Sequence, residues 1–253
     1  MRENLLPILI ISSLILMSTV FSAFAYASSE TISLNPIADS YVEEYEPNSN
    51  HGGASTLEVA NSTNMFVLCD EAYLMFNLSA IPSGATIESA TFQVYTSMIT
   101  ETHIIGAHYC ADNSWSEMGI TWINKPTYSN SASDIQTVGR QNTWYNWTVS
   151  NDVKGALGAK KITFVLKSET PHDTAWVWFY SRDQTYSWMQ QYEPVLTVTY
   201  SISNSNPSSS GIPSFPWESV MIGGIVGLTL VYLLRKRRFL SNSSKFQPKS
   251  VKF

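Results

Sequence analysis

Cysteine is scarce in this chain, which contains only two among 253 residues, Cys69 and Cys110. One pair cannot build the disulfide framework that holds small secreted domains together. Two alternatives stay open from the sequence, because an oxidising exterior permits a bridge while free cysteines are also commonly buried. We take a Cys69–Cys110 disulfide as the prediction, and in either case a hydrophobic core must stabilise the fold.

Basic side chains are also few between residues 28 and 210, where 18 acidic residues face only 7 basic ones, a net charge of −11. Binding to nucleic acid or to an anionic membrane surface requires a basic patch that neutralises phosphates. The composition therefore excludes nucleic acid as an expected partner.

Catalytic motifs are absent as well, since the sequence contains no GxSxG, HExxH, CxxC or GxxxxGK[ST]. The histidines are scattered, and His103 and His108 stand an odd number apart in one predicted strand, so they point to opposite faces. Carboxylate pairs of the glycosidase type would arise by chance among 18 acidic residues. We therefore predict that the protein is not an enzyme.

Long apolar runs occur only near the two ends of the chain. Residues 1–27 have the pattern of a signal peptide, with an apolar stretch before small residues. Residues 217–238 combine an uncharged apolar segment with four basic residues, which predicts a transmembrane anchor or a sorting signal. We expect the protein at the cell membrane, with residues 31–200 outside the cell, a Ser- and Pro-rich stalk over 201–216 and a cytoplasmic tail over 239–253.

Between these ends, apolar and polar residues alternate with the period of β-strands. The alternation is clearest over residues 90–95, 162–167 and 195–200. Shorter runs occur at 41–42, 56–60, 73–78, 103–110 and 175–181. One short helix is expected at Val153–Leu157. Turn residues between the runs favour an all-β fold, a two-sheet antiparallel sandwich.

The segment from Asp112 to Pro126 contains two tryptophans, Trp115 and Trp122, on either side of a Ser-Glu-Met-Gly turn. Each ring can bury about 150–250 Å² when its indole N–H finds a partner. We therefore expect this segment to close a hydrophobic core, with both tryptophans buried.

Several motifs, taken in order, resemble a known family. They are ADSYV at 38–42, PNSNHGG at 47–53, AYLMFNLSAIPSGATIESATFQVYT at 72–96, SWSEMGITWINKP at 114–126, WYNWTVSNDV at 144–153 and FYSRD at 179–183. Together they resemble the DNRLRE-type domain, which overlaps carbohydrate-binding module family 96 and is similar to archaeal disaggregatase-related surface repeats. The resemblance implies a jelly-roll β-sandwich that binds alginate or another polysaccharide. Asn77 and Asn146 stand where the family usually has acids, which would weaken contacts to a cation or sugar made there.

A sugar ring binds an aromatic face, with polar groups at the rim. Strand alternation places Trp176, Trp178 and Tyr180 in one row, followed by Arg182, while the residues between them face the other way. If the row is exposed, it is a glycan platform whose arginine could hold a sugar carboxylate. If the row faces inward, it is part of the core.

A calcium site is the predicted cofactor site, because hard cations take clustered carboxylate oxygens. Asp39, Glu43 and Asp183 would supply these if the first and last strands meet, although surface acids are often merely solvated. Sequons at Asn61, Asn77 and Asn146 are predicted glycosylation sites.

The expected function is that of a membrane-anchored, non-catalytic cell-surface module that binds a polysaccharide or surface glycan through the aromatic row. The alternative is a structural or adhesive surface or envelope protein that binds no free glycan. An exposed aromatic strip favours the first, and a large apolar patch without a groove favours the second.

Overall fold

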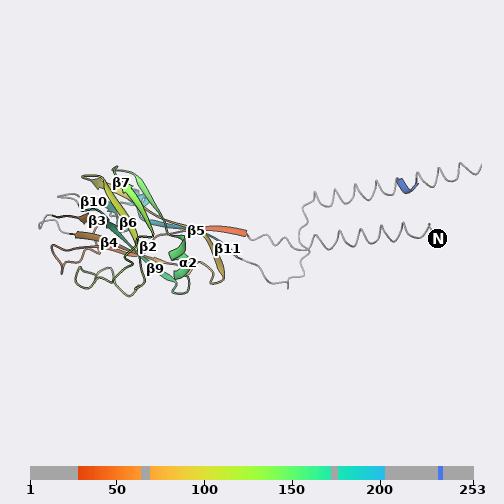
Figure 1. The fold of residues 1–253 in the computed structure, drawn as a ribbon, viewed down its shortest axis with the longest axis horizontal. Helices are drawn as coiled ribbons and strands as arrows, with labels where there is room; N and C mark the ends of the chain where they lie inside the picture. The colour runs from red at the N-terminus through yellow and green to blue at the C-terminus, as the bar shows by residue number, and fades with distance from the viewer. Residues whose placement is uncertain (1–27, 64–68, 172–175, 203–232, 236–253) are drawn as a thin grey trace, which may run out of the picture. The chain divides into compact units, whose positions relative to one another are not determined.

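The computed structural model describes residues 28–63, 69–171, 176–202 and 233–235. Its folded part is all-β, as predicted (Figure 1). The elements are β1 (Ser28–Leu34), β2 (Pro36–Glu43), β3 (Thr56–Asn61), β4 (Cys69–Asn77), β5 (Ala85–Ile99), β6 (His103–Cys110), β7 (Asp134–Val138), β8 (Trp144–Thr148), α2 (Ser150–Ala156), β9 (Lys161–Ser168), β10 (Trp176–Tyr180), the 3-10 helix η1 (Ser187–Tyr192) and β11 (Val195–Ile202).

The strands pair antiparallel in the order β1-β11-β5-β10-β3-β4-β9-β6-β7, with β2 added on β4 and β8 on β5. The sheet curls so strongly that β5 faces β4 and β9. Phe92 of β5 stacks on Phe164 with ring centroids 5.4 Å apart and meets Phe76 edge-on at 5.7 Å. One hydrophobic core therefore lies between two facing halves of the curled sheet, and α2 packs against β5 and β9 beside it.

The core is built by the alternation visible in the sequence. In β5, β10 and β11 every second side chain is buried, including Phe92, Phe179 and Val198. Burying one such side chain contributes about 1.5–3 kcal/mol. Trp147 is also fully buried, and its indole N–H donates to the carbonyl of Ile105 at 2.9 Å, so the ring enters the core without an unsatisfied donor.

Strands β4 and β9 are buried on both faces, which alternation alone does not predict. Their outer face carries Tyr73 and Val165 and is covered by the segment between β6 and β7. Trp115 and Trp122 pack there and stay half-buried, so the expectation that both would be fully buried is wrong. Each ring instead covers the sheet from outside and keeps a polar neighbour: the Trp115 indole donates to Thr163 Oγ1 at 3.1 Å, and Lys125 Nζ lies 3.1 Å from the Trp122 ring centre.

The predicted disulfide does not form, because both cysteines are free thiols. Strand register separates them: Cys110 pairs with Thr163 of β9, which is level with Met75 of β4. Cys69 lies six residues farther along β4, a strand length of about 20 Å. Bridged cysteines need Cα atoms within about 7 Å.

The predicted short helix is found as α2, which begins at Ser150 and ends at Ala156 without the expected side-chain cap. The predicted signal peptide over 1–27 lies outside the described residues, as do the predicted stalk, anchor and tail from 203 onward apart from 233–235. In the described part of the chain, no helix has the length and apolar character needed to cross a membrane.

Candidate functional site

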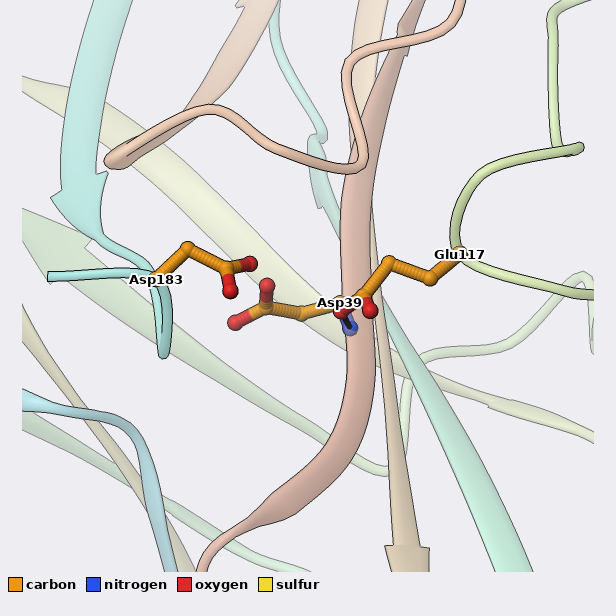
Figure 2. A group of neighbouring side chains, drawn as sticks. All are labelled: Asp39, Glu117 and Asp183. Atoms are coloured by element: carbon orange, nitrogen blue, oxygen red, sulfur yellow. Dashed lines mark hydrogen bonds between the residues drawn. The ribbon is translucent and has the colours of Figure 1, made fainter.

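Three acidic side chains from distant parts of the sequence meet at one place. Asp39 lies on β2, Glu117 lies in the segment between β6 and β7, and Asp183 follows the end of β10. One ligand oxygen from each lies within 4.8 Å of the others. Figure 2 shows Glu117 and Asp183 approaching Asp39 from opposite sides. This group, called here the acidic cluster, could hold a metal ion.

Hydrogen bonds fix the geometry of the acidic cluster. The backbone N–H of Asp39 donates to Glu117 Oε1 at 2.8 Å. The backbone N–H of Arg182 donates to Asp39 Oδ2 at 2.8 Å, and the Arg182 guanidinium lies 3.3 Å from Glu117 Oε1. The sequence suggested that Arg182 continues the aromatic row. In the structure it turns instead toward the acidic cluster. Its guanidinium is paired with Glu117, so part of its charge is already compensated.

Burial makes Asp39 the electrostatic centre of the cluster. Its side chain is 1% exposed. Burial is the main cause that raises the pKa of Asp39 to about 8, and the nearby carboxylates of Asp183 and Glu117 raise it further, while the hydrogen bond from the Arg182 backbone lowers it. An isolated carboxylate at this position is therefore unfavourable without a proton or a cation.

Of the three predicted metal ligands, the structure brings Asp39 and Asp183 together, whereas Glu43 lies outside the acidic cluster. Glu43 instead bonds to His51 Nε2 at 2.7 Å, and the His51 ring stacks on Tyr41. Strand alternation explains the separation, since residues 39 and 43 share a face but lie about 13 Å apart along β2. Glu117 was missed because it lies in a turn, where no periodic pattern indicates which way a side chain points.

The turn that carries Glu117 is held by the loop between β2 and β3. Asn50 Nδ2 donates to the carbonyls of Glu117 and Ile120, both at 2.7 Å. A Cβ added at Gly52 would lie 2.2 Å from the Glu117 carbonyl oxygen, so only glycine allows this approach. The PNSNHGG motif therefore positions one member of the acidic cluster.

The predicted aromatic row alternates as expected, with Val177 and Phe179 fully buried in the core. Trp176, Trp178 and Tyr180 lie on the opposite face but are only half-buried. The indole nitrogens of both tryptophans are buried. The two tryptophans are therefore only partly accessible to a ligand.

A larger group of rings gathers around Tyr180. Tyr95 of β5 stacks on Tyr180 at 6.0 Å and on Tyr192 of η1 at 4.4 Å, and Trp144 of β8 meets Tyr95 edge-on at 5.3 Å. These four residues form the aromatic cluster. Trp144 and Tyr95 are cross-strand partners, so the register of β5 and β8 creates this contact.

The segment that enters η1 bears two further rings in the open. Tyr186 and Trp188 are 60% and 62% exposed, and they stack on each other with centroids 6.1 Å apart and planes 24° apart. Tyr192, at the end of the same helix, packs on the aromatic cluster. The exposed pair is thus presented to solvent by a segment anchored on the sheet.

Comparison with known proteins places this aromatic surface in context. Residues 30–200 match carbohydrate-binding module family 96. The chain belongs to this family. No curated protein matches it. The more specific likeness to DNRLRE-type domains and archaeal surface repeats stays a prediction.

The family 96 domain also has a pocket of about 300 Å³, lined by Lys125, Pro126, Thr127, Tyr128, Asn130 and Lys167. Two of the few basic residues meet there. Lys125 pairs with Glu71 at 2.7 Å and lies over Trp122, so its charge is already compensated.

The three predicted glycosylation sites differ in accessibility. Asn77 and Asn146 are exposed. Asn61 is half-buried, and its side-chain amide donates to the carbonyl of Ser168 at 3.0 Å. A glycan on Asn61 would have to extend from a half-buried side chain, so the exposed Asn77 and Asn146 offer more room for a sugar.

A second acidic region of the module surrounds Asp70 on β4. Asp70 is buried, and burial raises its pKa to about 8, helped by the carboxylates of Glu58, Glu43, Glu44 and Glu71. Asp70 therefore takes up a proton on folding at neutral pH.

We expect Gly52→Ala to displace the turn that carries Glu117. The new methyl group would overlap the Glu117 carbonyl, a backbone atom that a side-chain rotation cannot move. Overpacking of this kind typically lowers stability by about 1–3 kcal/mol. Thermal unfolding measures the loss, with Gly53→Ala as the matched control because nothing lies near its added Cβ. Equal midpoints for the two variants would contradict the packing described here.

Asp70→Asn should flatten the pH dependence of stability. The folded-state pKa of about 8 lies above the unfolded value of 3.8, so the contribution of Asp70 is fully present below pH 3.8 and is lost as pH rises through 8. The variant should match the wild type near pH 4 and exceed it near pH 8 by a few kcal/mol, since one pKa unit corresponds to about 1.4 kcal/mol. Urea unfolding across this range measures the difference, and parallel curves would rule the effect out.

Proposed function

We propose that this module binds a polysaccharide without cleaving it, through the exposed pair Tyr186 and Trp188. An aromatic face stacks on the apolar side of a pyranose ring, and the exposed pair offers two near-parallel rings. Membership of a carbohydrate-binding family supports the ligand class. The observation that carries the proposal is the exposure of two rings stacked on each other, because contiguous exposed apolar surface marks interaction sites more than single exposed residues do.

The anchoring of η1 supports the same surface. Tyr192 stacks on Tyr95 and Tyr180, which belong to two paired strands. A ligand surface that is already ordered loses less conformational entropy on binding. The contacts around Tyr192 thus favour a preformed site at the end of the sheet.

The other two aromatic locations are less suited to a sugar. Trp178 faces Glu58 across the β3–β10 pair and has its indole nitrogen buried. In the pocket lined by Tyr128, Lys125 forms an ion pair with Glu71. We therefore replace the predicted Trp176–Trp178–Arg182 platform with the exposed pair and keep Tyr180 as part of its support.

The fold and location belong to the same proposal. The two facing halves of the curled sheet support a jelly-roll β-sandwich. The signal-like residues 1–27 and the apolar segment with its basic end over 217–238 support display outside the cell from a membrane anchor.

Protease added to intact cells should then remove the folded module and leave a tag placed after Phe253 intact. Loss of the tag, or protection of the module from the protease, would contradict this orientation.

Trp188→Ala should weaken polysaccharide binding while leaving stability nearly unchanged. Removing an aromatic that dominates a binding surface costs about 2 kcal/mol or more, about a 30-fold loss of affinity. An exposed ring contributes little to folding, so the thermal midpoint should move by no more than about 2 °C. Affinity electrophoresis in gels containing alginate, polygalacturonate, xylan or β-glucan measures retention on acidic and neutral polymers.

Tyr186→Ala should lose retention as Trp188→Ala does, because both rings belong to the exposed pair. The matched control is Tyr45→Ala, which removes a ring of similar exposure, 56%, from the loop after β2. Retention should survive in Tyr45→Ala. If all three variants bind as the wild type does, the exposed pair is not the glycan site.

A further inference from the structure

The acidic cluster has more negative charge than its surroundings compensate. Three carboxylates meet a single guanidinium, that of Arg182, which is paired with Glu117. When ionised, Asp39 and Asp183 leave two negative charges without a cation. Charge in a buried position is unfavourable unless it is paired or coordinated.

Hydrogen bonds do not complete the cluster either. Asp39 is 1% exposed, and its Oδ1 is buried without a hydrogen-bond partner among the described residues. Its Oδ2 accepts from the Arg182 backbone. Asp183 Oδ2 is likewise buried without a partner. Buried oxygens of this kind are uncommon in folded proteins and call for a proton, a water or an ion.

The donor set indicates which ion would fit. All three side chains offer carboxylate oxygens, the ligands of hard cations such as calcium, and none offers the nitrogen or sulfur that zinc usually takes. Calcium holds oxygens at about 2.3–2.6 Å, so two ligands on opposite sides of it lie about 5 Å apart. The oxygens of the acidic cluster lie within 4.8 Å of one another, which fits this span.

We propose that Asp39, Glu117 and Asp183 bind a divalent cation, calcium by their ligand chemistry, which clamps β2, the Glu117 turn and the segment after β10 together. The cation adds two positive charges where two are missing and supplies a partner for Asp39 Oδ1 and Asp183 Oδ2. None of the three ligand residues is one of the exposed rings, so calcium binding and glycan binding can be measured by different experiments.

The test uses the full-length chain, stripped with EDTA and titrated with calcium chloride. Isothermal titration calorimetry should show one saturable site. At 100 times the dissociation constant, calcium should raise the thermal midpoint by about 5–10 °C, because an ion that binds only the folded state stabilises it. Asp183→Asn and Asp39→Asn should remove both the calorimetric signal and the shift.

Glu43→Gln is the matched control, since Glu43 lies on the same strand as Asp39 but bonds to His51. It should bind calcium as the wild type does. The proposal is overturned if calcium up to 10 mM leaves the wild-type midpoint unchanged, which would mean that a shared proton satisfies Asp39. A midpoint shift of equal size in Asp183→Asn, or with sodium chloride at matched ionic strength, would indicate charge screening and would overturn it as well.

Discussion

Burial of β4 and β9 on both faces is the constraint on which the rest of the molecule depends. The inner face is covered by β5 because the sheet curls over itself. In the part of the chain that the structure describes, the long segment between β6 and β7 covers the outer face. That segment carries Trp115 and Trp122, and its turn places Glu117 beside Asp39. The packing requirement thus also creates the acidic cluster.

Four of the six motifs that carry the family resemblance meet at this place although they are far apart in sequence. Asp39 belongs to ADSYV, Gly52 to PNSNHGG, Glu117 to SWSEMGITWINKP, and Asp183 to FYSRD. The structure joins them by the contacts of Asn50 and Gly52 with the Glu117 turn and by the hydrogen bond from Arg182 to Asp39. Their common role is therefore to close one corner of the fold.

Strands could be predicted from the sequence wherever one face is buried. Val177 and Phe179 enter the core as alternation requires, and the runs at 90–95, 162–167 and 195–200 lie within β5, β9 and β11. Alternation predicts which face of the sheet a side chain lies on, but it does not predict which strand pairs with which, or in what register. The Cys69–Cys110 bridge failed for this reason, because the register of β9 separates the two residues.

The candidate site was harder to predict because its members lie in turns and in the 3-10 helix. Glu117 and Trp188 have no periodic pattern that gives their direction. Tyr192 reaches Tyr95 only because the chain returns to the sheet after β10, almost 100 residues later. Arg182 left the predicted row because the backbone turns at Ser181, whose hydroxyl donates to the Ala54 carbonyl. Such contacts depend on tertiary structure and leave no local signal.

The pairing of β1 with β11 has a mechanical consequence. Ser28 is the register partner of Ile202, so the chain enters and leaves the sheet at the same end of one antiparallel pair. Tension between these two points would open the ladder one hydrogen-bonded pair at a time, as a zipper opens, instead of shearing all its bonds at once. The outermost strand would therefore peel away under a small force, while the core beneath β5 and β9 keeps its packing.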